Sequence, residues 1–155
     1  MQARQELYVR KIKDGSVIDH ITSGFALDVL KILGINGKDG EVVSVAMNVE
    51  SKHLKAKDIV KIQNRELKPS EVDKIALIAP NATINIIRNY DVASKKVVEL
   101  PSSIHGIIKC DNPSCVSNSR EPVEPRLAVH QQEPIRLRCF FCGHVMERED
   151  VLKQF

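Results

Sequence analysis

The four cysteines near the C-terminus constrain the fold of this chain more than any other feature. They form two close pairs, Cys110/Cys115 and Cys139/Cys142, and the 155-residue chain has no others. Two close pairs separated by a longer stretch provide four thiolates that can converge on one tetrahedral zinc ion. Gly143 follows the second pair, where a positive φ lets backbone N–H groups point at the sulfurs. The spacing therefore predicts a structural site for Zn(2+), with a single ion per chain.

Other uses of the cysteines remain open at this point. Two disulfides would need an oxidising compartment, but no charged-then-apolar leader is recognised, and we expect a cytoplasmic chain with reduced thiols. A redox Cys-x-x-Cys would need a βαβ context and would leave Cys110 and Cys115 without a role. Four cysteines also close the coordination shell of zinc, which leaves no position for a catalytic water. We therefore expect the metal to fold a domain.

The distribution of charge separates the cysteine-bearing part from the rest of the chain. Residues 1–100 hold 16 Lys/Arg and 13 Asp/Glu, a net +3, whereas residues 101–155 hold 7 of each, a net zero. Zinc modules that hold nucleic acid are usually basic, because neutralisation of phosphates dominates such binding. A zinc-ribbon nucleic-acid-binding protein is therefore the alternative interpretation, in which Phe140 and Phe141 would stack on bases. No apolar run approaches the roughly 20 residues of a membrane helix, so we expect no membrane partner.

Hydrophobic periodicity predicts alternating strands and helices before the cysteines. The expected elements are a strand at 6–13, a helix at 25–33, strands at 41–49 and 57–64, a helix at 69–79, a strand at 82–90 and a short edge strand at 95–100. Ser23 is expected to cap the first helix, and Ser70 with Asp73 to form a capping box at the second. One face of a single strand is expected to carry Val43, Val45, Met47 and Val49.

The order β-α-β-β-α-β predicts an α+β fold, an N-terminal ferredoxin-like αβ sandwich with its helices on one face of an antiparallel sheet. From Ile104 onward, prolines punctuate short strand-like runs such as 126–130 and 134–138, and 147–155 is expected to be a helix or a tail. A unit of about 50 residues with few large apolar groups needs support. Structural zinc supplies about 10–16 kcal/mol in apparent terms. We expect domains at 1–100 and 101–155, the second a small zinc-bound β domain.

The positive part of the chain carries residues suited to a phosphorylated ligand. Lys57 and Lys61 have the same parity and so share a strand face, while Asp19 and His20 are expected on a loop after the first strand. Lysines bind phosphates as mobile charges, histidine adds a donor and aspartate can bind ribose hydroxyls. The candidate residues are Asp19, His20, Lys57, Lys61, Asn85 and Lys95. The alternative is a solvated sheet face. No nucleophile and base are paired as in an enzyme.

Several segments resemble, in one order, the regulatory chain family of aspartate carbamoyltransferase. They are 15–21, 57–62, 79–85, 89–90 and the two cysteine pairs, which together span nearly the full length. The resemblance implies a non-catalytic allosteric subunit of the enzyme that commits carbamoyl phosphate and aspartate to pyrimidine biosynthesis. It implies CTP, UTP or ATP in the N-terminal domain and a zinc domain that holds the catalytic chain. The implied assembly is a regulatory-chain homodimer within a heterododecamer of two catalytic trimers and three regulatory dimers.

Matched position by position, the resemblance also implies a role for each residue of a nucleotide site. Asp19 and Lys61 would meet the ribose and its neighbourhood, and His20 and Lys95 the phosphates, with Lys57 at the phosphate end or near a second nucleotide. Backbone groups of Ile12 and Tyr90 would read the base, with Asn85 and Val92 nearby and with Val9 and Val17 lining the pocket.

The chain also departs from the family pattern at four positions. Arg10 and Lys11 stand where an acidic and then a small residue are common, which adds positive charge beside the expected nucleotide. Ser114 replaces an asparagine in the first cysteine loop, and Gly143 stands where an acidic contact residue occurs. We therefore expect altered contacts at the subunit interface and an effect of Arg10 and Lys11 on effector preference.

Overall fold

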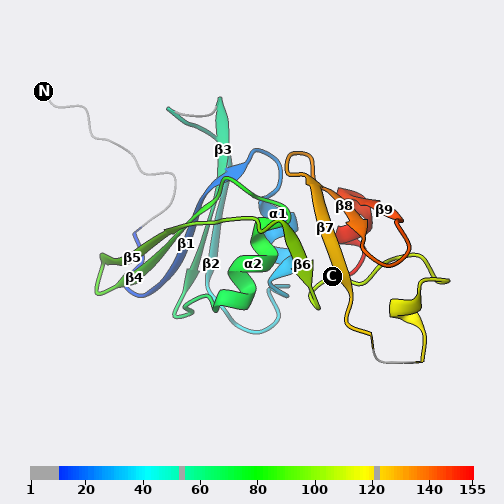
Figure 1. The fold of residues 1–155 in the computed structure, drawn as a ribbon. Coiled ribbons are helices and arrows are strands. Elements are labelled where there is room, and N and C mark those ends of the chain that lie inside the picture. The colour runs from blue at the N-terminus through cyan, green and yellow to red at the C-terminus, as the bar shows by residue number, and fades with distance from the viewer. Residues whose placement is uncertain (1–10, 53–54, 121–122) are drawn as a thin grey trace, which may run out of the picture.

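The computed structural model describes residues 11–52, 55–120 and 123–155. Within these residues the first sheet is antiparallel and has the spatial order β2-β3-β1-β4-β5 (Figure 1). Its strands are β1 (Gly15–Thr22), β2 (Val43–Glu50), β3 (Ala56–Gln63), β4 (Thr83–Arg88) and β5 (Asp91–Val97). The helices α1 (Ala26–Ile32) and α2 (Pro69–Ala76) follow β1 and β3. This order confirms the predicted α+β sandwich. The edge strand expected at 95–100 is present as β5, but it begins four residues earlier and ends at Val97.

Among the described residues, the first strand lies later in the chain than the strand that the sequence predicts. Of the strand expected at 6–13, residues 6–10 lie outside the described residues, and 11–13 are not in a strand. β1 begins at Gly15, whose φ is 139° and whose backbone lies against the carbonyl group of Ile62. Asp14 and Gly15 therefore open a strand instead of closing one. As a result Asp19 and His20 lie within β1, not on a loop after it.

The expected alternation along β2 holds for only part of the strand. Val43 and Val45 pair with buried residues of β3 and therefore share the face that packs on the helices. Val49 instead pairs with Lys57 on the opposite face, so its expected position is wrong. The reason is a bulge between Ala46 and Val49, in which Asn48 has a φ of 59°. An extra residue in a strand reverses the faces of the side chains beyond it.

The start of α1 is held by a carboxylate on β3 rather than by Ser23. Asp58 is fully buried, and its Oδ2 accepts the backbone N–H groups of Gly24 at 2.9 Å and Ala26 at 3.0 Å. Ser23 donates its hydroxyl proton to the Asn48 side chain instead. The expected local cap was therefore wrong, because a residue distant in sequence occupies the capping position.

The helix α2 begins at Pro69, as expected, but its cap differs from the sequence expectation. The N-cap residue is Lys68, and the side chain of Glu71 accepts the backbone N–H of Lys68 at 3.1 Å. The expected pairing of Ser70 with Asp73 is therefore wrong. Proline suits the first helical position because the backbone N–H that proline lacks would have no partner there.

No helix of the described ranges is long and apolar enough to cross a membrane.

The second sheet contains the short strands predicted around the cysteines. In the described part of the chain its order is β6-β7-β8-β9, with β6 (Ser103–His105), β7 (Arg126–Gln131), β8 (Arg136–Cys139) and β9 (Val145–Glu147). A 3₁₀ helix, η1 (Val116–Asn118), precedes β7, and the C-terminal segment forms a helix, α3 (Arg148–Leu152). Of the two alternatives expected for residues 147–155, a helix or a tail, the structure has the helix.

The helices lie between the two sheets and contribute to two apolar clusters (Figure 1). The first cluster joins the helices to the first sheet through residues such as Val29 and Ile75. The second cluster contains Ile32, Leu77 and Ile78 together with the buried residues of the second sheet and three of the cysteines. The two parts of the chain are therefore connected by buried side chains as well as by the backbone.

Gly15 provides a test of how β1 begins. A Cβ atom at position 15 would lie 2.0 Å from the Ile62 carbonyl oxygen, and the φ of 139° is strained for any side chain. We expect Gly15→Ala to lower the free energy of unfolding by about 3 kcal/mol or more. Gly37→Ala is the matched control, because Gly37 has a φ of 80° but no atom within 4 Å of the added Cβ. It should cost about 1–2 kcal/mol in the same urea titration, and equal costs would contradict the close approach.

Candidate functional site

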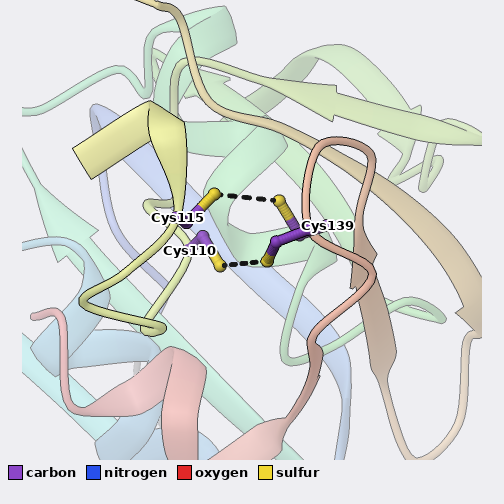
Figure 2. Close-up of side chains that lie close together, drawn as sticks. Cys110, Cys115 and Cys139 are labelled. Atoms are coloured by element: carbon purple, nitrogen blue, oxygen red, sulfur yellow. Dashed lines mark hydrogen bonds between the residues drawn. The ribbon is translucent and has the colours of Figure 1, made fainter. Parts of the chain in front are cut away.

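The four cysteine sulfurs meet in one place, as their spacing predicts. All four Sγ atoms lie within 4.8 Å of one another, and the pairs Cys110/Cys142 and Cys115/Cys139 are each separated by 3.6 Å (Figure 2). A disulfide would require about 2.05 Å, and all four thiols are free. A tetrahedral ion with Zn–S bonds of about 2.3 Å places its sulfurs about 3.8 Å apart. The donor set and its spacing therefore fit a structural zinc ion.

Two tight loops hold the cysteines in position. In the first loop, the side-chain oxygen of Asn112 accepts the backbone N–H of Ser114 at 3.0 Å. The backbone carbonyl group of Asn112 accepts the backbone N–H of Cys115, also at 3.0 Å. The amide of Asn118 donates to the carbonyl groups of Cys110 and Asn112, at 2.7 and 2.8 Å. These bonds close the loop without the help of a metal ion. As a result the side chains of Cys110 and Cys115 both point to the same side of the loop.

The second loop contains the glycine singled out in the sequence. Gly143 has a φ of 76°, as expected, and its N–H donates to the carbonyl group of Cys139 at 3.0 Å. The N–H of Cys139 in turn donates to the carbonyl group of His144 at 2.9 Å. His144 also joins the two loops, because its Nε2 lies 2.5 Å from Oδ1 of Asp111. Sequence reasoning missed this pair, although each residue is adjacent to a cysteine or one position removed.

The environment gives the cysteines different acidities. Burial raises the pKa of the Cys110 and Cys139 thiols above the ordinary value. The backbone N–H of His144 lowers the pKa of the exposed Cys142 thiol to about 6, so at neutral pH this residue offers a thiolate. A metal ion would release protons from the buried thiols, because only thiolates bind the metal.

The second candidate site lies on the face of the first sheet that is turned away from the helices. Lys61, Val17, Asn85 and Lys95 form one row across β3, β1, β4 and β5, because each is paired with the next. Their alternation with buried residues puts this row on the open face. The structure thus brings together four residues that are far apart in sequence.

Three further candidate residues lie close to that row. Nζ of Lys57 is 2.9 Å from Oδ1 of Asp19, and the same oxygen accepts the backbone N–H of His20 at 2.6 Å. Nδ1 of His20 lies 3.2 Å from Oγ1 of Thr83. Thr83 was missed by the sequence reasoning, although it is paired with Asp19 on the neighbouring strand. Asp19, His20 and Lys57 therefore form one polar group.

Electrostatics make the open face a candidate for an anion. Burial lowers the pKa of Lys61, the negative charge of Asp19 opposes this effect, and the positive charge of Lys11 adds to it. Lys11 is thus close enough to influence the face, whereas Arg10 lies outside the described residues. Cations that repel one another are stabilised when an anion binds between them.

The residues expected around the base of a nucleotide do not form a group as close as that of Asp19, His20 and Lys57. Ile12 is buried, and the next residue, Lys13, accepts the backbone N–H of Tyr90 at 2.8 Å through its carbonyl group. Tyr90, in the turn between β4 and β5, is 60% exposed, and Val92, near the start of β5, is 59% exposed. Val9 lies outside the described residues. These positions lie at the end of the sheet where β1 begins and β4 turns into β5.

Comparison with known proteins shows which family these two sites belong to. Residues 7–99 match the family model described as the aspartate carbamoyltransferase regulatory chain, allosteric domain, and residues 102–152 match that of its metal binding domain. The chain is 56% identical to the aspartate carbamoyltransferase regulatory chain of Korarchaeum cryptofilum over 97% of both chains. It is 53% identical to that of Hyperthermus butylicus over 99% of this chain and 97% of the relative.

The metal centre is tested by replacing a buried cysteine. We expect the purified protein to hold about one zinc ion per chain, and Cys139→Ser to lose it because three thiolates bind more weakly than four. Stability should fall by about 4 kcal/mol or more, as measured by thermal unfolding alongside zinc content from plasma mass spectrometry. Ser114→Ala is the control, since Ser114 is exposed in the same loop and contributes only its backbone there. Full zinc content in Cys139→Ser would contradict the four-sulfur site.

Proposed function

The chain belongs to the family of aspartate carbamoyltransferase regulatory chains, which are non-catalytic, and we propose that it senses nucleotides and adjusts the activity of catalytic chains in pyrimidine biosynthesis. CTP, UTP or ATP binds the open face of the first sheet. The metal-binding domain holds the catalytic chain. The observation that carries this proposal is the row of Lys61, Asn85 and Lys95 with the Asp19–Lys57 pair, located inside the match to the allosteric domain.

The dimensions of the open face suit a nucleotide better than a single phosphate. Lys61 and Lys95 are separated by three strand spacings, about 14 Å at 4.7–4.9 Å each. Lys95 and His20 bind the phosphates, and Asp19 with Lys61 binds the ribose. Lys57 lies at the phosphate end or near a second nucleotide. Backbone groups of Ile12 and Tyr90 read the base. The exposed Tyr90 and Val92, together with Asn85 and Val17, surround it.

The metal ion that the four cysteines suit is zinc, and its role is to hold the two loops as a single surface. Cys110, Cys115, Cys139 and Cys142 are its ligands, and their closed shell leaves no position for substrate. The first loop exposes Ser114, and the second exposes Phe140 and Phe141. These loops contact the catalytic chain. Loss of the metal therefore allows the two loops to separate, and the contact surface that they form together is lost.

The edge of the first sheet supports a homodimer of regulatory chains. Within the part of the chain that the structure describes, β2 is an edge strand, and edge strands offer unpaired backbone groups to a second chain. A groove of about 580 Å³ lies between α1 and β2, and it is lined by Leu27, Leu30, Val43 and Val45 among others. Leu27 is 61% exposed in the single chain. A second copy covers this surface, and three such dimers join two catalytic trimers in a heterododecamer.

The mechanism is a shift between two arrangements of the complete enzyme. A nucleotide regulates only if it binds one arrangement more tightly than the other. The sheet that carries the nucleotide shares an apolar cluster with the helices, and the helices share a second cluster with the metal-binding part. Displacement of the helices therefore changes the packing around the loops that hold the catalytic chain.

The zinc-ribbon alternative is not favoured. The Arg126 guanidinium lies 4.6 Å from the centroid of the Phe140 ring and covers a face that a base would need. The match of residues 102–152 to the metal binding domain of the regulatory chain supports the regulatory role over this alternative.

Nucleotide binding is tested on the isolated chain by calorimetric titration. We expect CTP or ATP to bind, and Lys61→Ala combined with Lys95→Ala to weaken binding by about tenfold or more, because two phosphate and ribose contacts are lost. Lys109→Ala with Lys153→Ala is the control, since these two lysines are exposed in the metal-binding part, away from both the row and the groove beside β2. Unchanged affinity after loss of Lys61 and Lys95 would place the nucleotide elsewhere.

Assembly is tested by sedimentation with and without metal. The chain alone should form dimers, and addition of catalytic trimers should give the heterododecamer. After removal of metal with a mercurial we expect dimers to persist while the larger complex disappears, because the dimer surface on β2 is remote from the cysteines. Retention of the large complex by the metal-free chain would refute the role of the metal.

A further inference from the structure

Asp58 is a buried carboxylate with bonds to two other segments of the chain. It is 0% exposed, and its Oδ2 accepts N–H groups on either side of Phe25, from Gly24 at 2.9 Å and Ala26 at 3.0 Å. Its Oδ1 accepts the N–H of Asn48 at 2.8 Å. A buried charge is tolerated when several hydrogen bonds replace its water. One side chain therefore sets the positions of the start of α1 and the bulge of β2.

Asp58 is also adjacent to the proposed nucleotide face. Lys57 precedes it on β3, and neighbouring side chains of a strand point to opposite faces. Lys57 pairs with Asp19 on the open face at 2.9 Å, whereas Asp58 binds the helix start on the other. A single peptide unit thus connects a candidate anion contact to the cap of α1.

The two strands that flank Asp58, β1 and β2, both depart from regular pairing with β3 close to Asp58. β1 changes register between Ile18 and Ile21, and β2 between Ala46 and Val49. Each irregular segment contains a residue with positive φ, His20 at 57° and Asn48 at 59°. Left-handed conformations of non-glycine residues and bulges are local features that can take an alternative arrangement. His20 belongs to the polar group on the open face, so the irregularity reaches the proposed ligand.

The other end of this connection reaches the metal-binding part. Phe25, which lies between the two N–H groups that Asp58 binds, packs against both apolar clusters. The guanidinium of Arg148 in α3 lies 4.2 Å from the centroid of the Phe25 ring. The same guanidinium is 2.7 Å from a carboxylate oxygen of Glu133. A change in the position of Phe25 would therefore act directly on α3.

We propose that Asp58 is a positioning residue that transmits nucleotide binding on the first sheet to the metal-binding part, through Phe25 and Arg148. The proposal rests on the proposed function. An anion bound at Lys57 competes with Asp19 for the ammonium group and displaces the backbone that Lys57 shares with Asp58. The hydrogen bonds of Asp58 carry this displacement to both sides of Phe25.

The test separates nucleotide affinity from nucleotide response. Asp58→Asn offers one carbonyl oxygen, so it cannot accept from both the helix start and Asn48. In the enzyme assembled with catalytic chains, we expect the factor by which CTP changes the half-saturating aspartate concentration to fall by about twofold or more. CTP affinity of the chain should stay within about twofold of wild type. Asp28→Asn, with its carboxylate in the first turn of the same helix, should change neither quantity.

Arg148→Met gives a second test that does not disturb the buried carboxylate. It keeps an apolar stem over Phe25 but removes the cation, and we expect the same loss of CTP response at unchanged CTP affinity. The double variant should lose no more than the larger single loss, because both residues act in one connection. If Asp58→Asn does not fold, Arg148→Met decides the question by itself.

The outcomes distinguish this proposal from the one it rests on. A wild-type chain that binds no nucleotide, or an assembled wild-type enzyme that does not respond to CTP, overturns the proposed function. A wild-type response that persists in full in Arg148→Met, or in a folded Asp58→Asn, overturns the role of Asp58 alone. Parallel loss of affinity and response in Asp58→Asn also overturns it, since the residue would then act on binding.

Discussion

Apolar side chains cover the helix layer on both of its sides, and the arrangement of the chain depends on this double burial. Val29 and Ile75 pack toward the first sheet, whereas Ile32, Leu77 and Ile78 pack with the second. Close-packed interiors transmit displacement because they contain few voids in which a shift can be absorbed. The helices therefore cannot move against the first sheet without disturbing the packing around the cysteines, which is the physical requirement of a regulatory chain built from two domains.

The metal site fixes the shape of the apolar cluster that the helices share with the second sheet. Without metal, burial keeps the thiols of Cys110 and Cys139 protonated, while the exposed Cys142 is already acidic enough to ionise. An ion bound by all four sulfurs would join the loop before η1 to the loop after β8. The contact of His144 with Asp111 connects the same two loops outside the sulfurs. Stability of this part and the shape of its surface thus have a common origin.

Local patterns predicted the features that depend on residue type and spacing. The convergence of the cysteines followed from two pairs of ligands, and the shared face of Lys57 and Lys61 followed from their parity along a strand. Predictions failed where a distant residue replaced a local one. Asp58 took the capping position expected of Ser23, and Asp14 with Gly15 opened a strand because Gly15 packs against the backbone of β3.

The sequence by itself determined the fold class, the four-sulfur site and the family, because ligand spacing, periodicity and ordered motifs are properties of the chain read locally. Only the tertiary structure decided that Lys61, Val17, Asn85 and Lys95 form one row, since strand order and register arise from pairing between distant segments. The same is true of Asp58. Its type and position in the sequence are ordinary, and its bonds to α1 and β2 exist only because the folded sheet brings three segments to one carboxylate.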